Sequence, residues 1–279
     1  MTALKNINVS AAESFKPNCD GVFLDLPEAV YRQADGVNIS SLKIMGRSPA
    51  HYYARINAPA ITPTPAMVFG TLLHRAVLEP NKLAGSFAVK PRDIDFRSKE
   101  GKAWRDSQTL PIIDEDQATA LDAAANKVMA HKYASSILAN TEKEVSVFKW
   151  RNLGGDLLLK GRLDAVAEDD NGYTTIVDIK TTEDASQAAF AKSIANFGYA
   201  EQAAYYMDLI GASFFIFIAV EKTAPYEIGV YCLDNDSIDH GRAINNRNLD
   251  TLENCLKTNQ WAGYSDSLQT IKLPAWATK

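Results

Sequence analysis

The sequence predicts an α/β fold with a mixed central β-sheet flanked by helices. Helical patterns come first, a group of strand patterns follows, and helices and strands then alternate toward the C-terminus. Residues 157–159 and 174–177 are apolar or β-branched runs of the kind that a buried sheet contains. Residues 168–172, between the two runs, have the composition of a turn, so the runs are expected to pair as a hairpin.

The order of elements is read from caps, prolines and hydrophobic periodicity. Residues 1–36 show no regular pattern, so we expect a lead-in or arm over residues 1–37 and a single domain over residues 38–279. Ser40 or Ser41 is expected to cap the first helix, and Ser48-Pro49 opens a second one. Residues 58–65 form a proline-rich loop, and residues 90–110 are a charged segment expected to be a loop close to nucleic acid. Further helices are expected at 66–78, 114–138, 185–194, 199–210 and 237–257, and further strands at 144–150, 213–220 and 226–233.

The composition is that of a globular protein with a sizeable core. The chain has 279 residues, of which 46% are hydrophobic and 23% are charged. The longest apolar run, residues 214–220, is strand-sized and too short to span a bilayer. The first residues lack the apolar core of a signal peptide, so we expect a cytoplasmic protein without a membrane partner. Cys19, Cys232 and Cys255 are scattered, which argues against a disulfide framework or a cysteine metal cluster.

The charge of the chain is unevenly distributed. The net charge is −5, yet residues 43–106 contain eleven Lys or Arg against five Asp or Glu, so this segment carries +6 and the rest −11. A basic segment on an acidic protein is typical of a face that contacts DNA. A solvated basic surface without a partner is an equally good interpretation.

The residues with the clearest chemistry lie on the predicted hairpin. Asp164 lies on its first strand, and Asp178 and Lys180 follow on the second. Because side chains alternate along a strand, Asp178 and Lys180 share one face while Val177 and Ile179 point into the core. An Asp-x-Lys pair on a strand is usually a solvent-facing ion pair. Charges on buried strands are costly, however, and this favours a site for a divalent metal and a phosphate, and therefore phosphodiester chemistry.

Four polar residues outside the hairpin are further candidates. His74 lies in an apolar helix, where a lone histidine is more often a core residue than a ligand, but Gly70 one turn earlier permits close approach. Gln202 and Tyr206 are four residues apart and share one helical face, either packing on the sheet or serving the site. Glu144 opens a strand and is either an additional carboxylate or an exposed charge.

Four motifs in order resemble the RecB-type branch of the PD-(D/E)xK nuclease superfamily: Gly70-x-x-x-His74, Gly161-x-x-Asp164, Asp178-x-Lys180 and Gln202-x-x-x-Tyr206. A further set resembles RecE-type nucleases, the C-terminal domain of exonuclease VIII: Ser48-Pro-Ala-His-Tyr52, Leu78-Glu-Pro80, Lys102-Ala-Trp104 and Leu273-Pro-Ala-Trp276. The resemblance runs from about Asn38 to Trp276. It implies a restriction-endonuclease-like core and a magnesium-dependent exonuclease, with Mn²⁺ as a substitute, that degrades one strand of linear duplex DNA from its 5′ end.

The resemblance also implies a role for each candidate residue. His74, Asp164 and Asp178 match metal-binding positions, the main-chain carbonyl of Ile179 is a further ligand, and Lys180 matches the catalytic lysine. The remaining matches, which hold the site or the DNA, are Gln202, Tyr206 and, less clearly, Glu144. Proteins of this type work in phage-type recombination beside a single-strand annealing protein and form rings around DNA. The chain lacks the long N-terminal extension of RecE and the cysteines of iron–sulfur nucleases, so no such cluster is expected.

Other functions are compatible with the same residues. A structure-specific or single-strand nuclease would use the same fold and differ only in substrate. A non-catalytic DNA-end-binding protein or inhibitor would also keep the fold, although Asp164, Asp178 and Lys180 are intact. A purely structural protein would carry the same charges as surface ion pairs and would bind no Mg²⁺.

Overall fold

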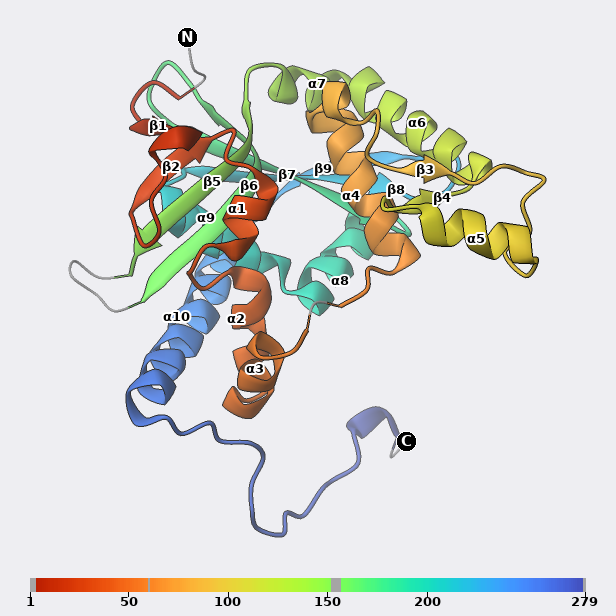
Figure 1. Cartoon of the computed structure of the whole chain (residues 1–279). Helices are drawn as coiled ribbons and strands as arrows, with labels where there is room; N and C mark the ends of the chain where they lie inside the picture. Colours follow the sequence, from red (N-terminus) through yellow and green to blue (C-terminus); the bar gives the residue numbers. More distant parts are fainter. Residues whose placement is uncertain (1–3, 60, 152–156, 278–279) are drawn as a thin grey trace.

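The computed structural model describes residues 4–59, 61–151 and 157–277, so Ala60 of the proline-rich loop lies outside the described residues. Within these ranges a seven-stranded mixed sheet forms the centre of the protein (Figure 1). In spatial order its strands are β1 (Val9–Ala11), β2 (Gly21–Leu24), β5 (Glu142–Trp150), β6 (Leu158–Glu168), β7 (Thr174–Thr182), β8 (Phe214–Glu221) and β9 (Ile228–Cys232). β1–β2 and β7–β8 are parallel pairs and the other neighbours are antiparallel. The predicted α/β class with a mixed central sheet is therefore confirmed.

Helices cover both faces of the sheet (Figure 1). One face packs against α2 (Ile39–Met45), α9 (Tyr199–Ile210) and α10 (Asn235–Thr258), with α3 (Pro49–Ile56) and α8 (Gln187–Phe197) beside them. The other face packs against α4 (Pro65–Leu78), α6 (Glu115–Ala130) and α7 (Lys132–Ala139). The smaller elements are α1 (Glu28–Gln33), α5 (Lys99–Ser107), β3 (Ala88–Val89), β4 (Ile112–Ile113), η1 (Ala12–Ser14), η2 (Pro80–Lys82) and η3 (Ala275–Ala277). None of the described helices has the length and apolar character needed to cross a bilayer.

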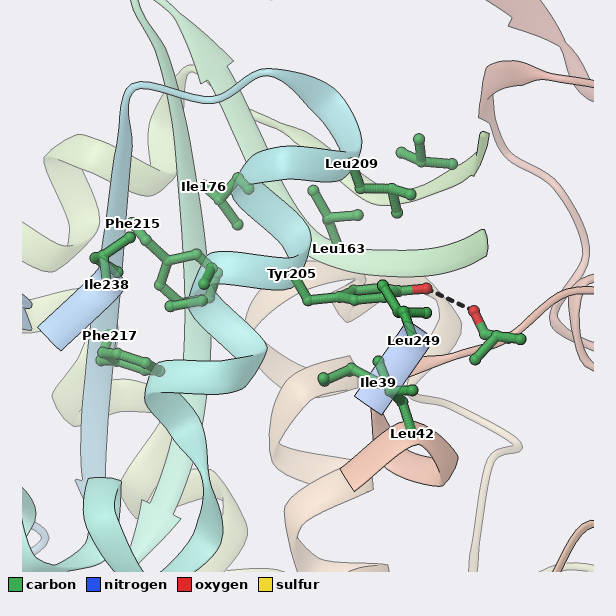
Figure 2. Close-up of a cluster of buried hydrophobic side chains, with 14 of the residues drawn as sticks. Ile39, Leu42, Leu163, Ile176, Tyr205, Leu209, Phe215, Phe217, Ile238 and Leu249 are labelled. Atoms are coloured by element: carbon green, nitrogen blue, oxygen red, sulfur yellow. Dashed lines mark hydrogen bonds between the residues drawn. The ribbon is translucent and has the colours of Figure 1, made fainter. Parts of the chain in front are cut away.

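The sheet separates two hydrophobic clusters. Figure 2 shows the larger one, in which α9 and its Tyr205 and Leu209 lie against Leu163 and Ile176 of the sheet. The Tyr205 hydroxyl donates a hydrogen bond of 2.5 Å to the carbonyl of Val37, which ties the chain before α2 to this cluster. Val177 and Ile179 of β7 belong to the cluster on the opposite face. The alternation predicted for β7 is therefore confirmed, and it leaves Asp178 and Lys180 on the α9 side.

The expectation that the N-terminal residues are irregular is wrong. β1 and β2 extend the central sheet, because β2 pairs with β5 in antiparallel register. Phe23 and Leu26 are buried with Phe148 and Leu158 in a third cluster. The sequence pattern does not predict these strands, because they are only three and four residues long and too short for a periodic pattern. The boundary at residues 37 and 38 remains a proposal.

Local hydrogen bonds correct three other expectations. The first helix after the lead-in is capped by Asn38, whose Oδ1 accepts the Ser41 N–H at 2.9 Å, rather than by Ser40 or Ser41. The helix expected over 114–138 divides at His131, whose Nδ1 accepts the Ala134 N–H and caps α7. The segment 90–110 is not all loop, because Ser98 caps α5.

Candidate active site

The site lies where β6 and β7 separate. Their antiparallel ladder runs from Glu168–Thr174 to Ala165–Val177, and the next pair in register would be Asp164 and Asp178. At that point the Asp164 carboxylate instead accepts the Ile179 N–H, with Oδ2 at 2.8 Å from the nitrogen. A side chain thus replaces a ladder hydrogen bond, and the two carboxylates lie at the fork between the strands.

The opposite side of β6 is also irregular at this level. The pairing of β5 with β6 includes Lys143–Ala165 and Val145–Leu163 and omits Glu144 with Asp164. Glu144 has a φ of 51°, in the left-handed region that a non-glycine residue rarely adopts. Irregular pairing of this kind changes the direction of side chains on a strand, and here Glu144 and Asp164 line the same cavity.

Asp178 is the most deeply buried charged group of the site. It is 1% exposed, and its Oδ1 accepts a hydrogen bond of 2.9 Å from the Gln202 amide on α9. Its Oδ2 forms an ion pair with the Lys180 ammonium. A buried carboxylate oxygen that already faces a positive charge is a fitting ligand for a metal cation.

His74 approaches the fork from α4. Its Nδ1 lies 3.1 Å from Asp164 Oδ2, and both side chains are largely buried. Gly70 is not what permits this approach, because a Cβ there would lie 3.4 Å from Thr181 Oγ1, an ordinary contact. The structure therefore places His74 beside Asp164, and the role of both residues as metal ligands stays a prediction.

The remaining candidates surround this group. Tyr206 is partly buried, is stacked on Phe215 with ring centroids 6.5 Å apart, and lies close enough to Asp178 and Asp164 for burial and their charges together to raise its pKa. Glu144 Oε2 accepts a hydrogen bond of 2.6 Å from Arg162 Nε. Both Glu144 and Arg162 line a cavity of about 420 Å³ that also includes His74 and Asp164. The polar surroundings of the site are thus wider than the four motifs indicated.

Burial and mutual charge shift the pKa values of the site. For His74, burial lowers the pKa, but the Asp164 carboxylate outweighs burial and the pKa is raised. For Asp164, burial raises the pKa, while His74 and Lys180 outweigh it and the pKa is lowered. Burial raises the pKa of Asp178 against the opposing charge of Lys180. The pKa of Lys180 is raised, since Asp178 and Asp164 outweigh its burial. The site thus favours a charged lysine and an ionised Asp164.

The donor set fits a hard divalent cation. Among the described residues, no three His, Cys, Asp or Glu side chains already form a ligand cluster. Asp164, Asp178 and His74 nevertheless converge on the fork, and carboxylate oxygens suit Mg²⁺ while imidazole suits softer divalent ions. Ile179 places its N–H against Asp164, and its carbonyl stays a predicted ligand.

Two neighbours of the site were missed by the sequence reasoning. Lys180 Nζ lies 5.1 Å from the centre of the Tyr199 ring on α9, and Lys43 Nζ of α2 lies 6.0 Å from the same ring. In the sequence, the only indication that Tyr199 lies near the site is its position one helical turn before Gln202. Lys43 lies more than 130 positions before Lys180 and Tyr199 in the sequence. Only the tertiary packing of α2 beside α9 brings these residues together, so the sequence alone gives no indication of the contact.

The fold of this chain is similar to that of a solved structure. A candidate exonuclease from Eubacterium rectale matches with a TM-score of 0.59 and 12% identity, over 86% of this chain and 90% of that one. An alkaline exonuclease from Laribacter hongkongensis matches over 48% of this chain and 69% of its own, with 14% identity and a TM-score of 0.29, a similarity that supports no conclusion. None of the curated proteins matches the chain in sequence.

A family model matches residues 38–274, and its description is a PDDEXK-like domain of unknown function. This match confirms the resemblance to the PD-(D/E)xK superfamily and covers far more than half of the chain. The protein belongs to the family of PDDEXK-like domains of unknown function, DUF3799.

Proposed function

We propose that this protein is a Mg²⁺-dependent exodeoxyribonuclease that degrades linear double-stranded DNA from the 5′ end and leaves 3′ single-stranded tails. The observation that carries the proposal is the fork of β6 and β7. There, Asp164 and Asp178 lie together, and the buried Oδ2 of Asp178 forms an ion pair with Lys180. The family match and the fold support a nuclease of the PD-(D/E)xK type; substrate and polarity come from the resemblance of the motifs.

Asp164, Asp178, His74 and the Ile179 carbonyl would hold the Mg²⁺ ion, for which Mn²⁺ would substitute. When bound there, the ion would neutralise charge on the phosphate and favour deprotonation of an attacking water. Gln202 fixes one oxygen of Asp178, and the other oxygen, Oδ2, would be the one to hold the cation. Lys180 is charged and would orient the water or stabilise the negative charge that develops on the phosphate.

Glu144 and Tyr206 have supporting roles in this proposal. Glu144 is tied to Arg162, and burial together with the Asp164 charge raises its pKa. It would supply a further carboxylate next to the cavity beside His74. Tyr206 would keep α9 in place behind the fork, since its ring contacts the position where Gly161 lacks a side chain.

The proposed partners are double-stranded DNA ends, a single-strand annealing protein and other copies of the chain in a ring. An acidic subunit could surround DNA if the basic segment of residues 43–106 lined the channel. Sedimentation on duplex DNA tests this arrangement. A ring-sized complex is expected, and a lone monomer on DNA would argue strongly against it.

The test of the reaction uses linear duplex labelled at either end, beside circular duplex and single-stranded DNA, in Mg²⁺. Loss of the 5′ label first, with no cut in the circular duplex, is the expected result. Cutting of circular or single-stranded DNA would instead identify a structure-specific or single-strand nuclease. Calorimetric titration with Mg²⁺ identifies a purely structural protein, which would bind no Mg²⁺. The digestion assay identifies a DNA-end-binding protein, which would bind DNA without degrading it.

A further inference from the structure

An aromatic ring lies beside the ammonium group of Lys180. Lys180 Nζ is 5.1 Å from the centroid of Tyr199, a distance at which the ring attracts a cation. Tyr199 begins α9, one turn before Gln202, which donates to Asp178 Oδ1. The first turn of α9 therefore contacts both members of the Asp178–Lys180 pair.

The Tyr199 ring is fixed from behind by the core. Its centroid lies 5.9 Å from that of Phe217 and 6.2 Å from that of Phe190. Both phenylalanines are buried, at 0% and 1% exposure. A ring held against two buried rings has few alternative positions, so it offers Lys180 a rigid contact.

Lys43 fixes the turn that precedes Tyr199. Its Nζ donates to the carbonyls of Phe197 at 2.9 Å and Gly198 at 3.2 Å, at the C-terminal end of α8. Gly198 has φ 63° and ψ 45°, and a Cβ on it would lie 2.8 Å from Lys43 Cδ. The lysine thus neutralises the end of α8 and covers the glycine turn from which α9 starts.

Lys180, the proposed catalytic lysine, needs a contact other than Asp178 to keep its ammonium group in position. A lysine side chain has a flexible four-carbon stem, and here its ammonium pairs with the carboxylate that a divalent cation would also bind. A cation at Asp178 would weaken this ion pair, whereas an aromatic ring is not a ligand for Mg²⁺. The ring can therefore hold the ammonium in place whether or not the carboxylate is occupied.

We propose that Tyr199 is a positioning residue for Lys180, and that Lys43 acts through the Gly198 turn to set the Tyr199 ring. The kinetic consequences of this proposal rest on the proposed nuclease function. Its geometric part, the contact between ring and ammonium, is independent of that function.

Tyr199→Leu tests the kinetic part. With linear duplex and Mg²⁺, kcat is expected to fall by about tenfold while KM changes by less than about twofold, since the ring holds the reacting group and not the DNA. Tyr199→Phe keeps the ring and should restore kcat to within about twofold of the wild type. A loss of the same size in both variants would assign the effect to the hydroxyl and contradict the proposal.

Phe23→Leu is the matched control for packing. It removes a buried ring from the third cluster, where the ring contacts Phe15 and Phe148. If the two variants lower the melting temperature equally, Phe23→Leu should retain much more kcat than Tyr199→Leu. Equal losses of kcat would show that Tyr199 only maintains the fold.

A double variant tests the role of Lys43. Lys43→Met should lower kcat less than Tyr199→Leu does, and adding it to Tyr199→Leu should cause no further decrease, because Lys43 acts through the ring. A decrease that multiplies with that of Tyr199→Leu would mean that Lys43 acts on its own, which would contradict this part of the proposal.

A spectroscopic measurement without metal or DNA separates this inference from the nuclease assignment. In protein labelled with ¹³C at the lysine ε carbons, the Lys180 ε protons should be shifted upfield by the Tyr199 ring, with Lys180→Arg identifying the signal. The shift should persist in Tyr199→Phe and disappear in Tyr199→Leu. An unshifted Lys180 signal in the wild type would overturn the inference even if the leucine variant did not fold. An upfield signal in a protein without nuclease activity would refute only the proposed function.

Discussion

Asp178 is the residue on which the account of the site depends. It is buried almost completely, and its two oxygens have different partners: Gln202 donates to Oδ1, while Oδ2 forms an ion pair with the Lys180 ammonium. Burial of a carboxylate is costly unless its oxygens are paired. Gln202 and Lys180 each pair with one oxygen, and a divalent cation at the fork would share Oδ2 with the ammonium while Gln202 orients the carboxylate.

Gln202→Met tests this orientation. Methionine fills a similar volume but leaves Asp178 Oδ1 without its amide donor. Nuclease activity, or the affinity for Mn²⁺ measured by calorimetry, is expected to fall by about 10–100-fold, the usual cost of removing a partner that orients a metal ligand. Unchanged Mn²⁺ affinity together with unchanged activity would show that the hydrogen bond does not serve the site.

The His74–Asp164 contact predicts a pH dependence of stability. The pKa of His74 is raised above 6.5 in the folded protein, so this contact stabilises the fold fully below the unfolded pKa and is lost as the pH rises through the folded pKa. In metal-free protein, the melting temperature of wild type minus that of His74→Gln should therefore be larger at pH 6 than at pH 9. An equal difference at the two pH values would contradict the assigned ion pair.

At the scale of elements, the fork depends on α9 packing closely on β6. A Cβ on Gly161 would lie 2.7 Å from a Leu209 methyl and 3.0 Å from the Tyr206 ring. The glycine therefore sets the distance at which the helix carrying Gln202 lies from the strand carrying Asp164. Its place in the Gly161-x-x-Asp164 motif has a packing explanation.

Two glycine variants are expected to differ in sign. Gly161→Ala should destabilise the protein by about 1–3 kcal/mol through overpacking against α9. Gly70→Ala lies inside α4, where the added Cβ has an ordinary contact, so it should stabilise the protein by up to about 1 kcal/mol. Denaturant unfolding measures both. A neutral Gly161→Ala would mean that α9 can move away from β6 at little cost.

The hairpin could be predicted from the sequence because its signals are local. Residues 174–177 are β-branched, the turn at 168–172 is polar, and the alternation around Asp178 holds in the structure. The fork was not predictable, since it depends on where the ladder stops and on a side chain that replaces a backbone partner. The position of Lys43 and Tyr199 near the site could not be predicted either, because α2 meets α9 only through tertiary packing.

At the scale of the whole molecule, much of the basic segment is neutralised locally. Arg92, Arg97 and Arg105 form ion pairs with Glu115, Asp95 and Asp106. In the part of the chain that the structure describes, the exposed Lys99 and Lys102 of α5 form no such pair. These two lysines, three residues apart on one helix, are therefore better placed to contact phosphates than the count of charges over residues 43–106 suggests.

Charge reversal on α5 tests a DNA-contacting role. In an Asp178→Asn background without metal, Lys99→Glu/Lys102→Glu should weaken duplex binding and reduce the slope of log K against log salt by about two. Lys257→Glu, an exposed lysine in the last turn of α10, serves as the control and should change the slope little. Equal slopes for the double variant and the wild type would exclude α5 from the DNA interface.

We propose above all that the fork of β6 and β7 is a metal-dependent site for phosphodiester hydrolysis. The most direct test is the Mg²⁺-dependent release of nucleotides from linear duplex by the wild type, Asp178→Asn and the exposed control Asp170→Asn, whose side chain is 94% accessible. Asp178→Asn should lose more than about 10³-fold of the rate, while Asp170→Asn should match the wild type. Full Mg²⁺-dependent degradation by Asp178→Asn, or none by the folded wild type, would contradict the account.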